Sequence, residues 1–186
     1  MISPSGPAAV PAPDGEPAAP AGLSHEAPGH PAPGAEAPGI PVSASALVFD
    51  QQGRLLILRP VYKSGWTIPG GVMEADGETP WDACRREVLE ETGVEVLSGR
   101  LACMDYRRPK PGNPGGIRFL FDCGVADEAQ LAAIRLQPEE IGEHRLAPLT
   151  EALDLLRRPI RRRVRAAVRG GRLVYLENGR PVSGLG

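Results

Sequence analysis

The sequence predicts a layered α/β or α+β domain, because strand-like and helix-like segments alternate along most of its length. Of its 186 residues, 41% are hydrophobic, which suits a single globular core better than two full domains. The composition changes sharply near residue 41, so we expect the domain to occupy residues 42–186, about 145 residues.

Residues 1–41 differ from the rest of the chain in composition. They hold 11 of the 21 prolines, interleaved with alanine and glycine, and almost no large apolar side chains. Such a segment buries too little surface to offset its ordering entropy. We therefore expect a disordered, partly polyproline-II arm without the features of a proline-rich ligand.

The first half of the domain begins with a predicted β-hairpin. Residues 42–49 alternate roughly between apolar and small polar types, residues 54–59 form a short apolar run, and Asp50-Gln-Gln-Gly53 joins them. Residues 65–71 (GWTIPGG) are expected to form a loop with a short strand.

The next element has the signals of a well-capped helix. Thr79 suits the N-cap, Pro80 the first helical position, Asp82 the third position after the cap, and Gly93 the termination. After it we expect strands at 94–106 and 117–125, separated by a basic loop at 107–116, and a short helix at 127–134. The remaining predicted elements are a strand at 141–146, one helix or two between 150 and 169 with a break at Pro159, and a strand at 173–176 before an Asn178-Gly179 turn.

Charge and composition exclude several classes of protein. The net charge is −2, so no overall footprint for nucleic acid is present, and no apolar run reaches the 18 residues of a membrane span. No Lys or Arg precedes Arg54, so no secretory signal is expected. Three cysteines without CxxC spacing favour reduced thiols in a cytoplasmic protein.

Three glutamates on the predicted 80–92 helix form the strongest chemical signal. Glu87, Glu90 and Glu91 stand at i, i+3 and i+4, about 5–6 Å apart on one face, where like charges destabilise a helix. A Mg²⁺ or Mn²⁺ ion would resolve this repulsion, because carboxylate oxygens are the ligands that such ions prefer. The alternative is a solvated acidic face beside Arg85 and Arg86, and the spacing alone does not separate the two.

The surrounding residues resemble the Nudix box. The run from Glu78, through seven residues, to Arg86-Glu87-Val88-Leu89-Glu90-Glu91-Thr92-Gly93-Val94 matches that family pattern at every position. The preceding Trp66-Thr-Ile-Pro69-Gly70-Gly71 is also similar to the approach to such a box, which here spans about residues 71–94. One departure is that six residues separate Gly71 from Glu78, where the family has five.

The resemblance implies an α/β/α sandwich with a mixed central sheet, and a pyrophosphohydrolase that uses Mg²⁺, with Mn²⁺ as a substitute. Its substrate would be a nucleoside diphosphate linked to another moiety, such as an ADP-sugar or a nucleoside triphosphate. Glu87 and Glu91 correspond to the principal metal ligands, with Glu90 beside them and Gly70 as a carbonyl ligand. The catalytic set would then comprise Arg86, Glu90, Glu91 and an acidic residue from a later loop.

That later acidic residue is expected in Gln137-Pro-Glu139-Glu140-Ile-Gly-Glu143. Glu140 is the preferred candidate, Glu139 and Glu143 are close rivals, and an ordinary exposed turn is the alternative. Four residues that precede the box are candidates for substrate binding: Arg54, Arg59, Tyr62 and Lys63.

Two other functions stay open at this stage. One is a nucleotide-sensing domain without catalysis, although such domains usually have an eroded box. The other is an RNA-directed enzyme that uses the arginine-rich C-terminal helix, where Ile160, Val164 and Val168 predict docking by an apolar face. We favour a solvated face for these arginines, so nucleic acid is not an expected partner, and a homodimer is an assembly that the resemblance allows.

Overall fold

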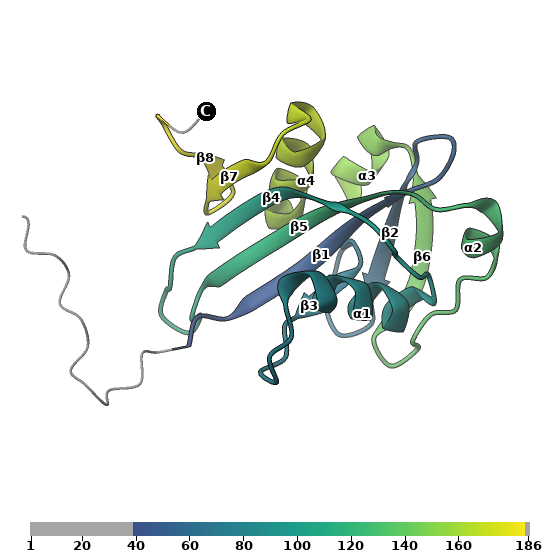
Figure 1. Cartoon of the computed structure of the whole chain (residues 1–186), viewed down its shortest axis with the longest axis horizontal. Helices are drawn as coiled ribbons and strands as arrows, with labels where there is room; N and C mark the ends of the chain where they lie inside the picture. The colour runs from purple at the N-terminus through teal and green to yellow at the C-terminus, as the bar shows by residue number, and fades with distance from the viewer. Residues whose placement is uncertain (1–38, 185–186) are drawn as a thin grey trace, which may run out of the picture. The chain divides into compact units, whose positions relative to one another are not determined.

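The computed structural model of the protein describes residues 39–184, so the arm predicted at 1–41 lies outside the described residues except for its last three. Eight strands form one sheet in this part of the chain (Figure 1). They are β1 (Val42–Phe49), β2 (Leu55–Pro60), β3 (Gly70–Val72), β4 (Arg100–Arg107), β5 (Gly116–Val125), β6 (Ile141–Ala147), β7 (Val174–Glu177) and β8 (Arg180–Pro181).

The sheet is mixed, as predicted. Its strand order is β6-β2-β1-β5-β4-β7-β8, and β3 pairs with β1 beside this path. The pairs β1–β5 and β4–β7 are parallel, whereas the other pairs are antiparallel. The predicted hairpin is confirmed, with Phe49 opposite Leu55.

Helices cover both faces of the sheet. They are α1 (Pro80–Thr92), α2 (Glu128–Ala132), α3 (Leu149–Leu155) and α4 (Arg158–Gly170). Helix α1 lies on one face and α3 and α4 lie on the other, which confirms the α/β/α sandwich (Figure 1). Among residues 39–184, no helix combines the length and apolar character that a membrane crossing requires.

The alternation of side chains along β2 separates the two cores. Leu56 and Leu58 pack with Val88 on the α1 side, whereas Leu55 and Ile57 pack with Val164 on the α4 side. This follows from the period of two in a strand, which sends successive side chains to opposite faces. All four β2 leucine and isoleucine side chains are buried, so both helical layers are anchored to this strand.

The predicted strand at 94–106 is wrong for residues 94–99, because β4 begins at Arg100. Val94 and Val96 are buried under α1, which explains the apolar alternation without any sheet pairing. Side chains bind this backbone instead: Gln130 Nε2 donates to the Glu95 carbonyl at 3.1 Å and Arg85 Nε to the Val96 carbonyl at 3.0 Å.

The C-terminal part also differs in detail from the prediction. The helical region divides at Leu156-Arg157, and Pro159 lies in the first turn of α4, where a missing N–H costs nothing, instead of causing the break. The predicted Asn178-Gly179 turn has positive φ at both residues and leads into β8, a strand that the sequence pattern did not indicate.

Helix α1 has the caps that the sequence predicts. The Thr79 side chain accepts a hydrogen bond from the Asp82 N–H at 3.2 Å, and Gly93 ends the helix in the left-handed conformation. Ala83, Cys84 and Val88 are buried beneath the helix. The caps and this apolar stripe fix the rotation of α1 and therefore the direction of its glutamates.

Replacing Thr79 by alanine is expected to destabilise the protein by about 1 kcal/mol, because the cap bond to Asp82 is lost. Urea denaturation would show this as a lower midpoint with an unchanged slope. Thr150→Ala is the matched control, since Thr150 is exposed in α3 and should shift stability by less than about 0.5 kcal/mol. Equal shifts in the two variants would contradict the capping role.

Candidate active site

Two glycines bring the β3 segment against both β1 and α1. A Cβ at Gly70 would collide with the Ala44 carbonyl and with Ser45, and Gly70 has φ +140°, which other residues rarely adopt. A Cβ at Gly71 would collide with the carboxylate of Glu87. The absence of side chains at both positions therefore permits the helix glutamates to lie directly against the β3 backbone.

Glu91 is bound from this backbone. Its side chain is buried, and its Oε2 accepts a hydrogen bond from the Gly70 N–H at 2.8 Å. No other hydrogen bond to the Glu91 carboxylate occurs in the described part of the chain. Glu91 Oε2 is thus held by the β3 backbone, and Glu91 Oε1 is available to another partner.

Arg86 holds three glutamates together. Its guanidinium donates to both oxygens of Glu78 at 2.8 and 3.2 Å, to Glu87 Oε1 at 3.0 Å and to Glu90 Oε2 at 3.0 Å. It also donates to the Val72 carbonyl at 3.1 Å. These charge-assisted bonds tie the loop after β3 to the exposed edge of α1.

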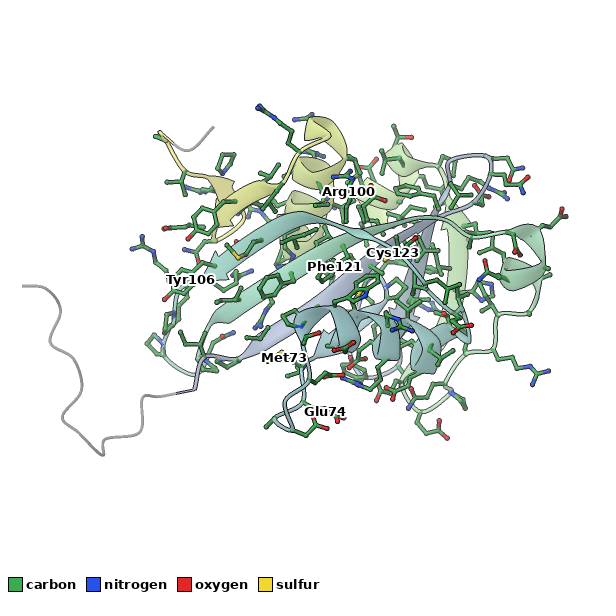
Figure 2. The ribbon with its side chains drawn as sticks, viewed as in Figure 1. Met73, Glu74, Arg100, Tyr106, Phe121 and Cys123 are labelled. Atoms are coloured by element: carbon green, nitrogen blue, oxygen red, sulfur yellow. The ribbon has the colours of Figure 1, made fainter. Side chains whose placement is uncertain are left out.

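Glu78 also makes a hydrogen bond within the loop between β3 and α1. Glu78 Oε2 accepts from the N–H of Glu74, which lies at the tip of the loop between β3 and α1 (Figure 2). Through Glu74 and Arg86, Glu78 therefore ties the loop after β3 to helix α1.

The carboxyls of Glu87 and Glu91 both have raised pKa values. The pKa of Glu91 is about 8, mainly because the side chain is buried; the charges of Glu87 and Glu140 add to the rise, whereas the hydrogen bond from Gly70 and the charge of Lys63 oppose it. Burial also raises the pKa of Glu87, while Arg86 opposes the shift. A nearby cation would favour the ionised form of both carboxyls.

A second wall of the site comes from two loops. The Val61 N–H donates to the Glu140 carbonyl at 2.8 Å, which places residues 61–63 beside the loop before β6. Glu140 and Lys63 both act electrostatically on Glu91. Tyr62 is exposed next to them, with Lys63 Nζ 4.5 Å from the centre of its ring.

Other predicted site residues lie elsewhere or are already paired. Arg54 forms an ion pair with Asp50 at 2.6 Å on the turn after β1, whereas Gly70 pairs with Ser45 in the first half of β1. Arg59 forms an ion pair with Glu143 at 2.9 Å between β2 and β6. Arg54 therefore closes the β1–β2 hairpin, and Arg59 already has a carboxylate partner.

The donor set fits an ion that keeps most of its water. Among residues 39–184, no group of three His, Cys, Asp or Glu side chains is arranged to hold a metal by itself, because Glu90 is turned toward Arg86. Mg²⁺ is typically bound through one or two carboxylates, waters and substrate phosphates. Glu87 and Glu91, which converge on the β3 backbone, fit that description, and a His- or Cys-rich metal site does not.

Two backbone contributions to the site are not evident from the sequence. Gly71 is predicted only as part of a motif, although the Glu87 carboxylate occupies the space that a side chain would take there. The Val72 carbonyl, which accepts from Arg86, is not identified, because main-chain acceptors carry no signal in side-chain patterns.

This fold and this cluster define a hydrolase built on an α/β/α sandwich, with its glutamates on one helix. Residues 39–168 match the family model described as "NUDIX domain". The chain belongs to this family and is a Nudix hydrolase, an enzyme that acts on phosphorus anhydride bonds.

Two Streptomyces proteins are similar over most of the domain. A "MutT-like protein" of Streptomyces ambofaciens is 42% identical over 61% of this chain and 77% of its own length. A "CMP-5'-(N-acetyl-N-hydroxy-3-aminopropyl)phosphonate hydrolase" of Streptomyces rubellomurinus is 32% identical over 71% of this chain and 63% of its own length.

Solved structures agree on the fold. The crystal structure of the MutT protein from Methanosarcina mazei Go1 has a TM-score of 0.60 at 26% identity and covers 71% of this chain and 95% of its own. An ADP-ribose pyrophosphatase from Streptococcus suis has a TM-score of 0.54 at 18% identity and covers 75% and 99%, respectively.

Glu91→Gln is expected to stabilise the metal-free protein at high pH. Because the folded-state pKa is raised, ionised Glu91 costs stability increasingly as pH rises from its ordinary pKa through about 8. The amide oxygen of glutamine can still accept from Gly70. In EDTA, the melting temperature of E91Q relative to the parent protein should therefore increase between pH 5 and 9.

Glu95→Gln serves as the control, since Glu95 is exposed just beyond α1. Its difference from the parent protein should stay nearly constant over the same pH range. A difference for E91Q that is flat or decreases with pH would contradict the unfavourable burial of this carboxylate.

Proposed function

We propose that the protein is a Mg²⁺-dependent pyrophosphohydrolase, for which Mn²⁺ can substitute, that cleaves a nucleoside diphosphate linked to another moiety. The observation that carries this proposal is the packing of the Glu87 and Glu91 carboxylates against Gly70–Gly71, with Arg86 fixing the neighbouring Glu78 and Glu90. The buried Glu91 carboxylate has one oxygen bound by the loop and one available.

The residues proposed to hold the ion are Glu87 and Glu91, with Glu90 and the Gly70 carbonyl beside them. A bound divalent cation supplies charge neutralisation on the diphosphate oxygens and lowers the pKa of a coordinated water. The protein contributes a fixed arrangement: Arg86 orients Glu87 and Glu90, and the Gly70 N–H orients Glu91. Preorganised ligands on a rigid helix avoid reorganisation during the reaction.

We assign the proton acceptor to Glu140. Its carbonyl accepts from Val61, two residues before Lys63, and its charge adds to the rise in the pKa values of Glu87 and Glu91 that burial mainly causes. Its rivals are less suited, because Glu143 pairs with Arg59 and Arg145, and Glu139 is exposed. Glu140 would take the proton from the attacking water as the phosphorus–oxygen bond forms.

The substrate side of the site would be formed by Tyr62 and Lys63. Lys63 lies within electrostatic range of Glu91 and can pair with a phosphate oxygen, and the exposed Tyr62 ring can stack on a base. Arg59 is a further candidate if the substrate displaces Glu143 from it. Arg54 is left out of this proposal because Asp50 and the hairpin turn hold it.

A nucleotide joined to a second group is the substrate class that the relatives favour. The Streptomyces rubellomurinus relative is named as a hydrolase of a CMP derivative. Relatives named "RNA pyrophosphohydrolase", such as that of Xanthomonas axonopodis pv. citri, are 41% identical over only 64 residues. The free thiols of Cys84, Cys103 and Cys123 favour a cytoplasmic location as part of the same proposal.

A panel of nucleotides tests the reaction and separates the enzyme from a sensor. Release of nucleoside monophosphate would be measured for NDP-sugars, CMP-linked compounds, dinucleoside polyphosphates and nucleoside triphosphates, with Mg²⁺, Mn²⁺ or EDTA. Turnover of at least one member that is lost in EDTA supports the proposal. Binding without any turnover would support a nucleotide-sensing domain instead.

Glu87→Gln and Glu91→Gln should each lower turnover by about 100-fold or more, because each removes a ligand charge from the proposed metal site. The measurement is kcat at saturating substrate over a Mg²⁺ titration, with Glu95→Gln as the control. E91Q is expected to be folded and stable, so its loss of activity would not result from unfolding. Near-parental kcat in either variant at saturating Mg²⁺ would rule out its ligand role.

Glu140→Gln should lower kcat by about 100-fold, the usual effect of a general base, with little change in KM. Glu139→Gln is the matched control next to it and should stay within about threefold of the parent protein. Equal effects in the two variants would assign the acidic loop a role other than proton transfer.

A further inference from the structure

A large hollow lies away from the α1 glutamates, between the β4–β5 loop, the start of α4 and the β7–β8 turn. Its volume is about 750 Å³. Tyr106 lies near the end of β4, next to Arg107 (Figure 2). Its backbone carbonyl accepts a hydrogen bond from the Asn178 N–H at 2.9 Å, which joins β4 to the β7–β8 turn. Six cationic side chains line the hollow: Arg107, Arg108, Lys110, Arg158, Arg162 and Arg180.

Acidic partners do not balance these charges. The one carboxylate in the lining is Glu177, which pairs with Arg108 at 2.7 Å. The other five cations have no ion pair with any described residue, although Arg162 donates to the Asn178 carbonyl at 3.4 Å. This concentration of positive charge stands on a chain whose formal net charge is −2, so it does not reflect a generally basic protein.

The repulsion extends below the surface. Burial lowers the pKa of Arg118 and of the largely buried Arg163, and the charge of Arg107 lowers both further. Arg163 is held by the buried Asp105 at 3.3 Å, and Asp105 also accepts from the Gly179 N–H at 2.8 Å. Asp105 therefore fixes α4 and the β7–β8 turn to β4 but leaves the cations of the hollow unpaired.

The start of α4 adds to the conflict. Its N-cap residue, Arg157, makes no capping side-chain bond, and its first turn contains no acidic residue. Positive side chains at a helix N-terminus oppose the helix dipole. A helix end of this kind, beside five unpaired cations, would be stabilised by a bound anion.

The hollow is separate from the proposed catalytic site. Helix α1 lies over the other face of the sheet, and three strand steps of about 4.8 Å, roughly 14 Å in total, separate β1 from β7. Glu177, Asn178 and Arg180 also lie beyond residue 168, where the match to the family model ends. The hollow thus depends on a C-terminal addition, β7–β8, and not on the family-matched segment alone.

We propose that this hollow is a second binding site, for a small anion that carries two or more phosphate groups. Five unpaired cations exceed what one phosphate can neutralise, and the volume admits a chain of phosphates. The lining contains no aromatic side chain on which a base could stack, which favours a compact oligophosphate over single-stranded nucleic acid.

Calorimetry with inorganic tripolyphosphate in EDTA tests this site on the full chain. The parent protein should bind it more tightly than orthophosphate, and Arg158→Gln with Arg180→Gln should weaken binding about tenfold or more. The single variants R158Q and R180Q are measured as well, with melting curves to show that each is folded. Binding should persist in Glu87→Gln with Glu91→Gln, since the catalytic glutamates lie on the other face.

The matched control is Arg165→Gln with Arg169→Gln, which removes the same charge from exposed positions farther along α4. This variant should keep its tripolyphosphate affinity within about twofold. Equal losses in the two double variants would overturn the proposal, as would equal binding of orthophosphate. An oligoribonucleotide without terminal phosphates that displaces tripolyphosphate at equal phosphate content would assign the hollow to nucleic acid instead.

Discussion

One electrostatic constraint governs the structure. Glu87 and Glu91, which lie one helical turn apart and are largely removed from water, both face the β3 backbone. Glu87 and Glu91 repel each other, and burial makes the ionised forms more costly. The surrounding fold keeps them in place: the glycine pair removes the side chains that would exclude them, and Arg86 neutralises the outer edge. The fold thus holds an arrangement of carboxylates that is electrostatically unfavourable, and the cation of the proposed function would relieve it.

This arrangement explains why the helix is anchored so firmly. A mobile α1 would relieve the repulsion by rotating its carboxylates into water. The Thr79 cap, the left-handed Gly93 and the buried Val88 stripe oppose that rotation, because each fixes a different part of the helix. The caps and packing that stabilise α1 therefore also hold its glutamates in an electrostatically unfavourable arrangement, as rigid elements do around a preorganised site.

Local patterns predicted the α1 caps, the β1–β2 hairpin and the glutamate cluster, and the resemblance to the Nudix family implied the two helical layers. They failed where the outcome depended on distant partners. Val94 and Val96 alternate like a strand because they pack under α1. The carbonyls of Glu95 and Val96 accept hydrogen bonds from the Gln130 and Arg85 side chains and not from a neighbouring strand. For Arg54, a candidate for substrate binding because it precedes the box, the sequence pattern did not indicate the ion pair with Asp50 on the hairpin turn.

The arginines of the C-terminal region show the same limit most clearly. In the sequence they form one run on an amphipathic helix, and a solvated face was the simplest interpretation. In the structure they separate into groups with different environments: Arg163 pairs with the buried Asp105, Arg161 donates to the Asp154 and Leu156 carbonyls, and Arg165 is exposed. Arg158 and Arg162 face a hollow whose far wall comes from β4, β7 and β8. Position along a helix does not determine which arginines share a site, since that depends on the strands that pack against it.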